Sequence, residues 1–119
     1  MFSRLLPKLI SLTSMVGETI MSLHNKNIGF IVKSDNTPLS QADKISHSFI
    51  TEALKEITPN IPILSEESKK IPFSVRRDWN TYWLIDPLDG TRNFLDGTRE
   101  FCISIAYIVN NYPVFGLIY

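Results

Sequence analysis

Apolar residues recur at every third or fourth position in two long stretches of the chain, which predicts two amphipathic helices. The first should pack on the body of the protein through Leu5, Leu9, Leu12, Val16, Ile20 and Leu23. The second should run over residues 40–57, where Ser40 and Asp43 are spaced as a capping pair. Residues 58–60 (Thr-Pro-Asn) should end it. Its apolar stripe comprises Ala42, Ile45, Phe49, Ile50, Ala53, Leu54 and Ile57.

Shorter apolar runs predict three strands that lead into polar segments. These runs occupy residues 28–32, 61–64 and 82–85. The third strand should stop abruptly at Asp86 and Pro87. Proline fixes its own φ and lacks an N–H group, so it cannot continue the hydrogen-bond ladder of a sheet.

The C-terminal pattern predicts a central strand followed by a hairpin. Residues 101–109 are apolar on both alternating faces, and residues 110–111 (Asn-Asn) should turn the chain into a partner strand over residues 114–119. Residues 71–80 should form an irregular connector. A strand buried on both faces needs a layer on each side, yet only two substantial helices are predicted, and an exposed apolar edge invites aggregation. We therefore expect an α/β fold of which these residues are the N-terminal part.

Composition narrows the class of protein. The chain has 119 residues, 44% of them hydrophobic and 20% charged, with a formal net charge of zero. These values suit one ordinary soluble domain or part of one, and they provide no basic face for a nucleic acid polymer. The single cysteine, Cys102, excludes an internal disulfide, suits a reducing compartment and lies in an apolar run, where we expect a small core residue.

No apolar run is long enough to cross a membrane. We therefore expect no transmembrane segment, and the reducing compartment that the single cysteine suits gives a cytoplasmic location as the expectation. The amphipathic N-terminal helix leaves peripheral contact at the inner face of the cell membrane as an alternative.

The densest group of chemically versatile residues follows the strand at residues 82–85. Asp86 and Asp89 lie three positions apart, and Gly90 and Thr91 come directly after them. Residues 91–95 predict a helical turn, whose first N–H groups lack helical partners. Carboxylate, carbonyl and hydroxyl oxygens beside a helix N-terminus suit hard cations and a phosphate group.

The same segment also resembles three other kinds of loop. Pro-Leu-Asp-Gly is also good β-turn chemistry, so an ordinary turn is the structural alternative. The Asp-x-Asp-Gly-Thr motif of haloacid dehalogenase-type phosphatases fails by one position. An EF-hand loop fails because Leu88 and Gly90 occupy positions that need oxygen-bearing side chains.

A second acidic segment, residues 65–68 (Ser-Glu-Glu-Ser), follows the strand predicted at residues 61–64. Ligands gather at the carboxyl ends of strands in α/β sheets, so Glu66 could converge with Asp86 and Asp89 on one metal cluster. An ordinary solvent loop is the alternative. For Asp43 the alternative is a first-turn carboxylate favoured by the helix dipole. We expect His47 at the surface, and we assign it and His24 no chemistry.

Together, residues 65–68 and 83–91 resemble the motifs of the inositol monophosphatase superfamily of magnesium-dependent, lithium-sensitive phosphatases. The chain looks most like the bacterial 3'(2'),5'-bisphosphate nucleotidase branch, on account of residues 33–43, residues 62–67 and the Glu100-Phe101 pair. The resemblance covers nearly the whole chain. It implies a layered α-β-α-β-α sandwich, of which residues 1–119 would be the N-terminal portion of a single phosphatase domain.

The resemblance also implies a set of metal ligands for two or three Mg²⁺ ions. Glu66 would bind one ion and help to orient the attacking water. Asp86 would bridge two ions, and Asp89 would bind the second. The backbone carbonyl of Leu88 would complete the ligands from this part of the chain.

Further roles concern the water and the substrate. Thr91 would pair with Glu66 around the nucleophilic water, and Asp43 would lie near a further metal or water. Residues 88–91 would line the phosphate, with the N–H groups of Gly90 and Thr91 facing its oxygens.

The implied reaction is hydrolysis of the 3'-phosphate of adenosine 3',5'-bisphosphate to AMP by a metal-activated water. The family carries a further Trp-Asp motif downstream, which is absent here, so we expect the isolated chain to be inactive. One alternative is an inositol phosphate or sugar phosphate phosphatase of the same superfamily. Others are an inactive truncated remnant and an unrelated metal-binding module.

Overall fold

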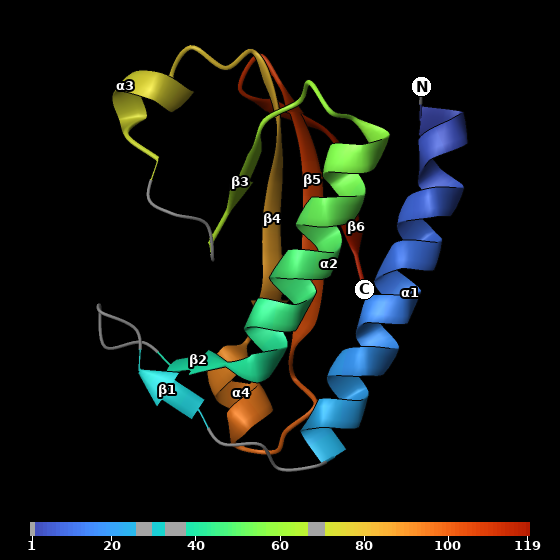
Figure 1. Cartoon of the computed structure of the whole chain (residues 1–119), viewed down its shortest axis with the longest axis vertical. Helices are drawn as coiled ribbons and strands as arrows, with labels where there is room; N and C mark the ends of the chain where they lie inside the picture. The colour runs from blue at the N-terminus through green and yellow to red at the C-terminus, as the bar shows by residue number, and fades with distance from the viewer. Residues whose placement is uncertain (1, 26–29, 33–37, 67–70) are drawn as a thin grey trace.

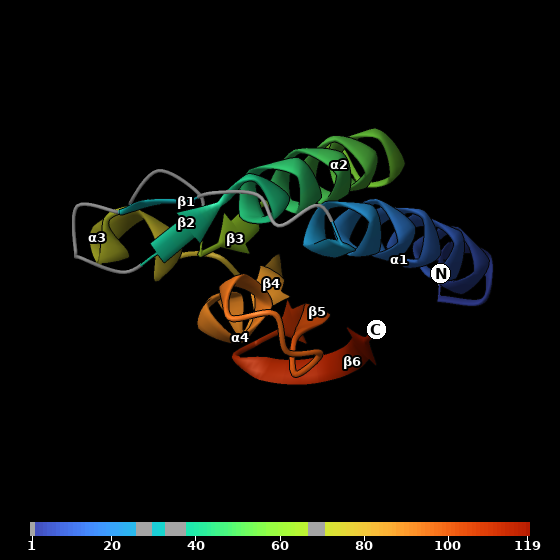
Figure 2. The same ribbon diagram turned by 90° about the horizontal axis from the view of Figure 1, so that it is seen from below.

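Two long helices cover one face of a four-stranded sheet (Figure 1; Figure 2). The computed structural model describes residues 2–25, 30–32, 38–66 and 71–119 of the chain. Helix α1 (Phe2–Asn25) and helix α2 (Gln41–Ile57) lie side by side and run in opposite directions (Figure 1). The expected α/β architecture is therefore present.

Both helices bury one face, as their periodicity predicts. Helix α1 buries Leu5, Leu9, Leu12, Val16 and Ile20. In α2 the buried stripe follows Ala42, Ile50 and Leu54 and also includes polar side chains. Phe49 was expected in this stripe but is 43% exposed. Adjacent helical positions differ by about 100° around the axis, so Phe49 falls at the flank once Ile50 faces the core.

Helix α2 begins one residue later than predicted, because Ser40 ends a short strand. Strand β1 (Phe30–Val32) pairs antiparallel with β2 (Pro38–Ser40) in a separate two-stranded sheet. The capping role expected for the Ser40 side chain lies outside the described side chains, and so does His24. The expectations for residues 28–29, 33–37 and 67–70 also fall outside the described residues.

The main sheet has the order β3-β4-β5-β6. Strand β3 (Ile63–Ser65) runs parallel to β4 (Thr81–Asp89), whereas β5 (Cys102–Val109) and β6 (Tyr112–Ile118) continue the sheet in antiparallel fashion. The central position of β5 and the hairpin after it are confirmed. Asn110 and Asn111 turn the chain with φ values of 49° and 68°, a conformation that asparagine tolerates better than most residues.

Two sequence predictions are wrong, one for the end of β4 and one for the segment that precedes this strand. Strand β4 continues through Asp86 and Pro87 to Asp89, and the ladder with β5 shifts register between Asp86 and Asp89. Proline is tolerated there because an irregular stretch of ladder does not need its missing N–H. The expected connector at residues 71–80 contains a short helix, α3 (Phe73–Arg76).

The core lies between the helices and the sheet and is centred on Trp83. This side chain is fully buried, packs against Tyr107 with ring centroids 4.8 Å apart, and donates its Nε1–H to Thr58 Oγ1 at 3.0 Å. The bond ties β4 to the end of α2 and leaves no unpaired indole N–H in the core.

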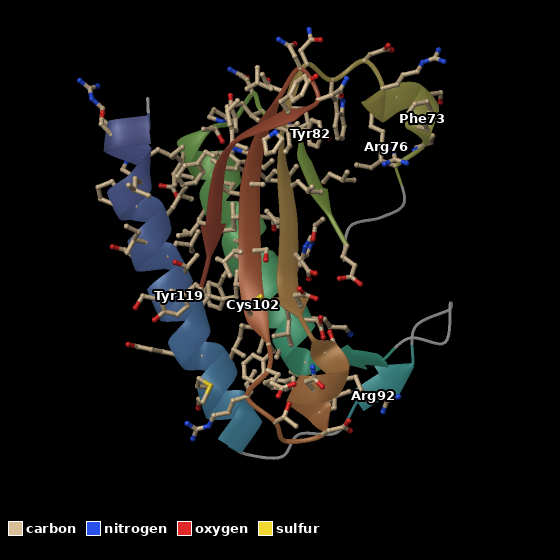
Figure 3. All side chains as sticks on the ribbon, turned by 180° about the vertical axis from the view of Figure 1, so that it is seen from behind. Phe73, Arg76, Tyr82, Arg92, Cys102 and Tyr119 are labelled. Carbon is tan, nitrogen blue, oxygen red and sulfur yellow. The ribbon has the colours of Figure 1, made fainter. Side chains whose placement is uncertain are left out.

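The other face of the sheet is more open, and Leu84 on that face is 43% exposed. Cys102 lies on β5 (Figure 3) and is only half-buried, so it is less enclosed than a core residue would be. None of the helices that the structure describes is long and apolar enough to cross a membrane.

Candidate active site

The structure brings Glu66 and Asp86 together at one edge of the sheet. Strands β3 and β4 are parallel and in register, with Ser65 opposite Ile85, so the next residue on each strand is an acid. The two carboxyl groups share a side-chain hydrogen bond. The convergence expected from two acidic strand ends is therefore present, and it follows directly from the parallel pairing.

The surroundings of Asp86 disfavour the ionised form of its carboxyl group. Burial, the neighbouring charge of Glu66, the hydrogen bond to Glu66 and the charge of Asp89 raise the pKa of Asp86 from 3.8 to about 7. The backbone N–H of Leu88, which donates to Asp86 Oδ1 at 3.3 Å, opposes this shift. A bound cation would favour the ionised form of such a group, because an opposite charge nearby lowers a carboxyl pKa.

The turn after β4 depends on glycine at position 90. Gly90 has φ of 90°, in the left-handed region, and directly precedes α4 (Thr91–Leu95), the helical turn predicted from the sequence. A Cβ atom at this position would lie 2.6 Å from the carbonyl oxygen of Glu100. Backbone conformation and space both disfavour a side chain here. Glycine therefore allows the chain to turn directly from β4 into α4, close to the backbone of Glu100.

The hydroxyl of Thr91 lies against Asp43 of α2. Its Oγ1 is 3.1 Å from Asp43 Oδ1 and 3.2 Å from the carbonyl oxygen of Leu88, and its single proton can be donated to either acceptor. Asp43 is fully buried. The pairing of Thr91 with Glu66 around a nucleophilic water stays a prediction, and the hydroxyl itself contacts Asp43 and Leu88. Asp43 is thus more than a solvated first-turn carboxylate.

Sequence reasoning missed two further polar contacts of α2. The buried hydroxyl of Ser46 donates to the carbonyl oxygen of Pro87 at 2.6 Å. His47 was expected at the surface but is half-buried, and its Nδ1 lies 3.0 Å from Ser65 Oγ. The available signal was spacing, since positions 46 and 47 lie three and four residues after Asp43 and share its helix face.

An open groove gives access to the carboxyl pair. Glu66 and Asp86 line one part of it, and Leu64, Leu84 and Ala106 line an apolar part. The groove has a volume of about 530 Å³. Ions and small molecules can therefore reach Asp86 from solvent without a rearrangement of the core.

The donor chemistry fits a hard cation, although the donors are not assembled around one centre. Within residues 2–25, 30–32, 38–66 and 71–119, no group of three or more His, Cys, Asp or Glu side chains is arranged to hold a metal ion. Glu66 and Asp86 instead form a hydrogen bond with each other, and two carboxyl groups can do so only when one of them is protonated. Carboxylate oxygens and the Leu88 carbonyl are the ligand types that Mg²⁺ prefers.

The sequence profile of the inositol monophosphatase family matches residues 3–119. The chain belongs to this family. A curated member, the 3'(2'),5'-bisphosphate nucleotidase CysQ of Aggregatibacter actinomycetemcomitans, is 39% identical over 117 residues, which cover 98% of this chain and 44% of that protein. The family resemblance that the motifs carried is thereby confirmed.

Solved structures agree with this assignment. CysQ from Bacteroides thetaiotaomicron superposes with a TM-score of 0.76 at 42% identity, over 92% of this chain and 40% of that chain. The extragenic suppressor protein suhB from Bartonella henselae gives a TM-score of 0.82 at 29% identity, over 98% and 45% respectively. The fold class is confirmed, and the chain spans less than half the length of these relatives.

Proposed function

We propose that this chain forms the N-terminal part of a magnesium-dependent phosphomonoesterase domain. The proposed substrate is adenosine 3',5'-bisphosphate, with AMP and phosphate as products, in keeping with the name of the CysQ relatives. The observation that carries the proposal is the meeting of Glu66 and Asp86, beside Asp89, at the ends of two parallel strands. The single cysteine is in keeping with a cytoplasmic location.

Glu66, Asp86, Asp89 and the carbonyl oxygen of Leu88 would hold the Mg²⁺ ions, two or three in number. When bound, Mg²⁺ neutralises phosphate charge, lowers the pKa of bound water and stabilises the leaving oxygen. The chain would thus supply hard oxygen ligands on one side of the phosphate. No side chain needs to attack the phosphorus, because water is the nucleophile.

Thr91 is suited to orient the attacking water. Its hydroxyl can donate its only proton to Asp43, which leaves the oxygen lone pairs to accept a hydrogen bond from the water. Because Asp43 is buried on a long helix, this acceptor is held beside the Thr91 hydroxyl before substrate binds. Asp43 would therefore act through Thr91.

The decisive experiment measures Mn²⁺ binding by the chain, with Mn²⁺ as a paramagnetic substitute for Mg²⁺. Asp86→Asn should weaken binding by about tenfold or more, because it removes a charged ligand from the carboxyl pair. Asp78→Asn is the matched control. Asp78 is an exposed carboxylate that pairs with Arg77 and lies two residues after Arg76, which is at the other end of the sheet from Arg92 (Figure 3). Equal binding by both variants and the unaltered chain would refute the metal site.

Phosphate release then separates the substrate classes. The chain is incubated with Mg²⁺ and either adenosine 3',5'-bisphosphate, inositol 1-phosphate or a sugar phosphate, with EDTA as the blank. We expect little turnover, with any EDTA-sensitive release greatest for the nucleotide. Faster release from inositol phosphate would replace the nucleotidase assignment with the alternative, and absence of Mn²⁺ binding would indicate a non-catalytic remnant.

A further inference from the structure

One face of α2 contacts all three segments that carry the proposed metal and water ligands. The N-terminal half of the helix lies over the end of the sheet where β4 leads into α4 (Figure 1). Asp43 accepts a hydrogen bond from Thr91 at the start of α4, and Ser46 donates to Pro87 near the end of β4. The third contact, between His47 and Ser65, reaches the end of β3. The three positions span little more than one helical turn.

Ser46 binds the backbone of β4 where the sheet itself does not hold it regularly. The ladder with β5 shifts register between Asp86 and Asp89, and the Pro87 carbonyl lies in this interval. Ser46 Oγ is buried and approaches that carbonyl to 2.6 Å. A buried carbonyl without a partner would be unfavourable, so this hydroxyl both satisfies it and fixes the backbone between Asp86 and Leu88.

His47 performs the corresponding task on β3. This strand has three residues, lies at the edge of the sheet and pairs with β4 alone among the described strands. Its last residue, Ser65, is buried and directly precedes Glu66. The 3.0 Å contact between His47 Nδ1 and Ser65 Oγ ties the end of a weakly anchored strand to a long helix.

We propose that Ser46 and His47 are positioning residues, which hold the ends of β4 and β3 at the separation that Asp86 and Glu66 need to share a cation. The inference rests on the proposed metal site and extends it to residues that touch neither metal nor substrate. Both contacts come from adjacent positions of one rigid helix. Loss of either would let one carboxylate move relative to the other.

The test compares Ser46→Ala and His47→Leu with the control Thr13→Val. Thr13 is also a buried helical hydroxyl, but it donates to the Leu9 carbonyl within α1 at 2.9 Å. Each of the two site variants should raise the dissociation constant for Mn²⁺ about tenfold, as loss of groups that orient metal ligands typically does. Thr13→Val should leave it unchanged.

Amide hydrogen exchange in the metal-free chain provides an independent measurement. His47→Leu should accelerate exchange at Ser65 and Glu66, and Ser46→Ala should accelerate it at Asp86 and Leu88. Exchange along the centre of β5 should not change in either variant. Uniform acceleration over the whole chain would mean general destabilisation and would overturn the positioning role.

Rescue and coupling complete the test. His47→Asn places an amide close to the position of Nδ1 and should restore most of the Mn²⁺ affinity lost in His47→Leu. Adding Ser65→Ala to His47→Leu should weaken binding no further, because both changes remove the same hydrogen bond. Additive losses, or failure of rescue with normal exchange, would contradict the proposal.

The two proposals fail in different ways. If the unaltered chain does not bind Mn²⁺, the proposed metal site is refuted. In that case local exchange at the ends of β3 and β4 still decides whether Ser46 and His47 hold them. If the chain binds Mn²⁺ and the two variants bind it equally well, only the positioning role is refuted.

Discussion

The two halves of β4 differ in what their residues contribute. Residues 81–85 pair regularly with β5, and Trp83 and Ile85 are buried beneath the helices. Residues 86–89 carry two carboxylates, Asp86 and Asp89, and the register with β5 shifts between them. The first half gains stability from apolar burial, whereas the second brings like charges together and accepts a hydrogen bond from α2 at the Pro87 carbonyl.

This difference shows how the fold tolerates an unfavourable group. Burial of Asp86 beside Glu66 and Asp89 disfavours its ionised form, an arrangement that the chain would avoid if stability at neutral pH alone mattered. It persists because the adjacent half of the same strand is firmly packed, and functional sites commonly depend on such support. Substitutions in the packed half should therefore mainly change the free energy of unfolding, whereas substitutions in and beside the other half should also change the proposed site.

Trp83→Ala should have the largest effect, on the packed half. It removes a fully buried indole and its hydrogen bond to Thr58, and it should lower the free energy of unfolding by about 3–5 kcal/mol. Urea unfolding followed by far-UV circular dichroism measures this change. Leu84→Ala, on the open face of the same strand, should lower it by about 1 kcal/mol or less. Similar losses for both would contradict the one-sided packing of β4.

Gly90→Ala should have the next largest effect, at the turn that directly follows the site half of β4. Gly90 and Gly97 both have left-handed φ values, 90° and 83°, but a Cβ at Gly97 would meet nothing within 4 Å. Gly97→Ala should therefore lower the free energy of unfolding by about 1–2 kcal/mol, which is the cost of holding alanine in a left-handed backbone conformation. Gly90→Ala should lower it further, because its Cβ would meet the Glu100 carbonyl at 2.6 Å. Equal effects would mean that the backbone yields at Gly90.

The sequence predicted the elements whose patterns are long and local. The apolar stripe of α1 and the apolar residues on both faces of β5 each extend over enough residues to indicate a helix and a strand. Helix α3 has four residues, too few for a periodic signal. The continuation of β4 past Pro87 could not be predicted locally, because it depends on a register shift set by pairing with β5.

The same distinction applies to the site. Glu66 and Asp86 were predicted to meet because each follows an apolar strand, and parallel pairing makes such ends adjacent. The contact of Thr91 with Asp43 spans 48 residues of sequence, and that of Ser46 with Pro87 spans 41. These residues meet because of the way α2 packs on the sheet. The spacing of residues within a motif does not predict that packing.

The smallest effect concerns pH and the site half alone. The pKa of Asp86 rises from 3.8 to about 7 on folding, so between these values the folded chain binds more protons than the unfolded chain. The stability that the protonated form contributes is complete below pH 3.8 and is lost as pH rises through about 7. The effect should be modest, because Asp86 is only half-buried and solvent screens its neighbours.

Thermal unfolding between pH 4 and pH 8, without metal, tests this expectation through the difference between the unaltered chain and Asp86→Asn. The melting temperature of the unaltered chain should fall relative to the variant as pH rises, because the amide cannot ionise. Saturating Mn²⁺ should reverse the order at pH 8, since a cation pairs with the ionised carboxylate and stabilises the state that binds it. A constant difference across the pH range would mean that Asp86 titrates at its ordinary pKa. The two halves of β4 would then differ in their pairing with β5, but the second half would not disfavour an ionised carboxylate.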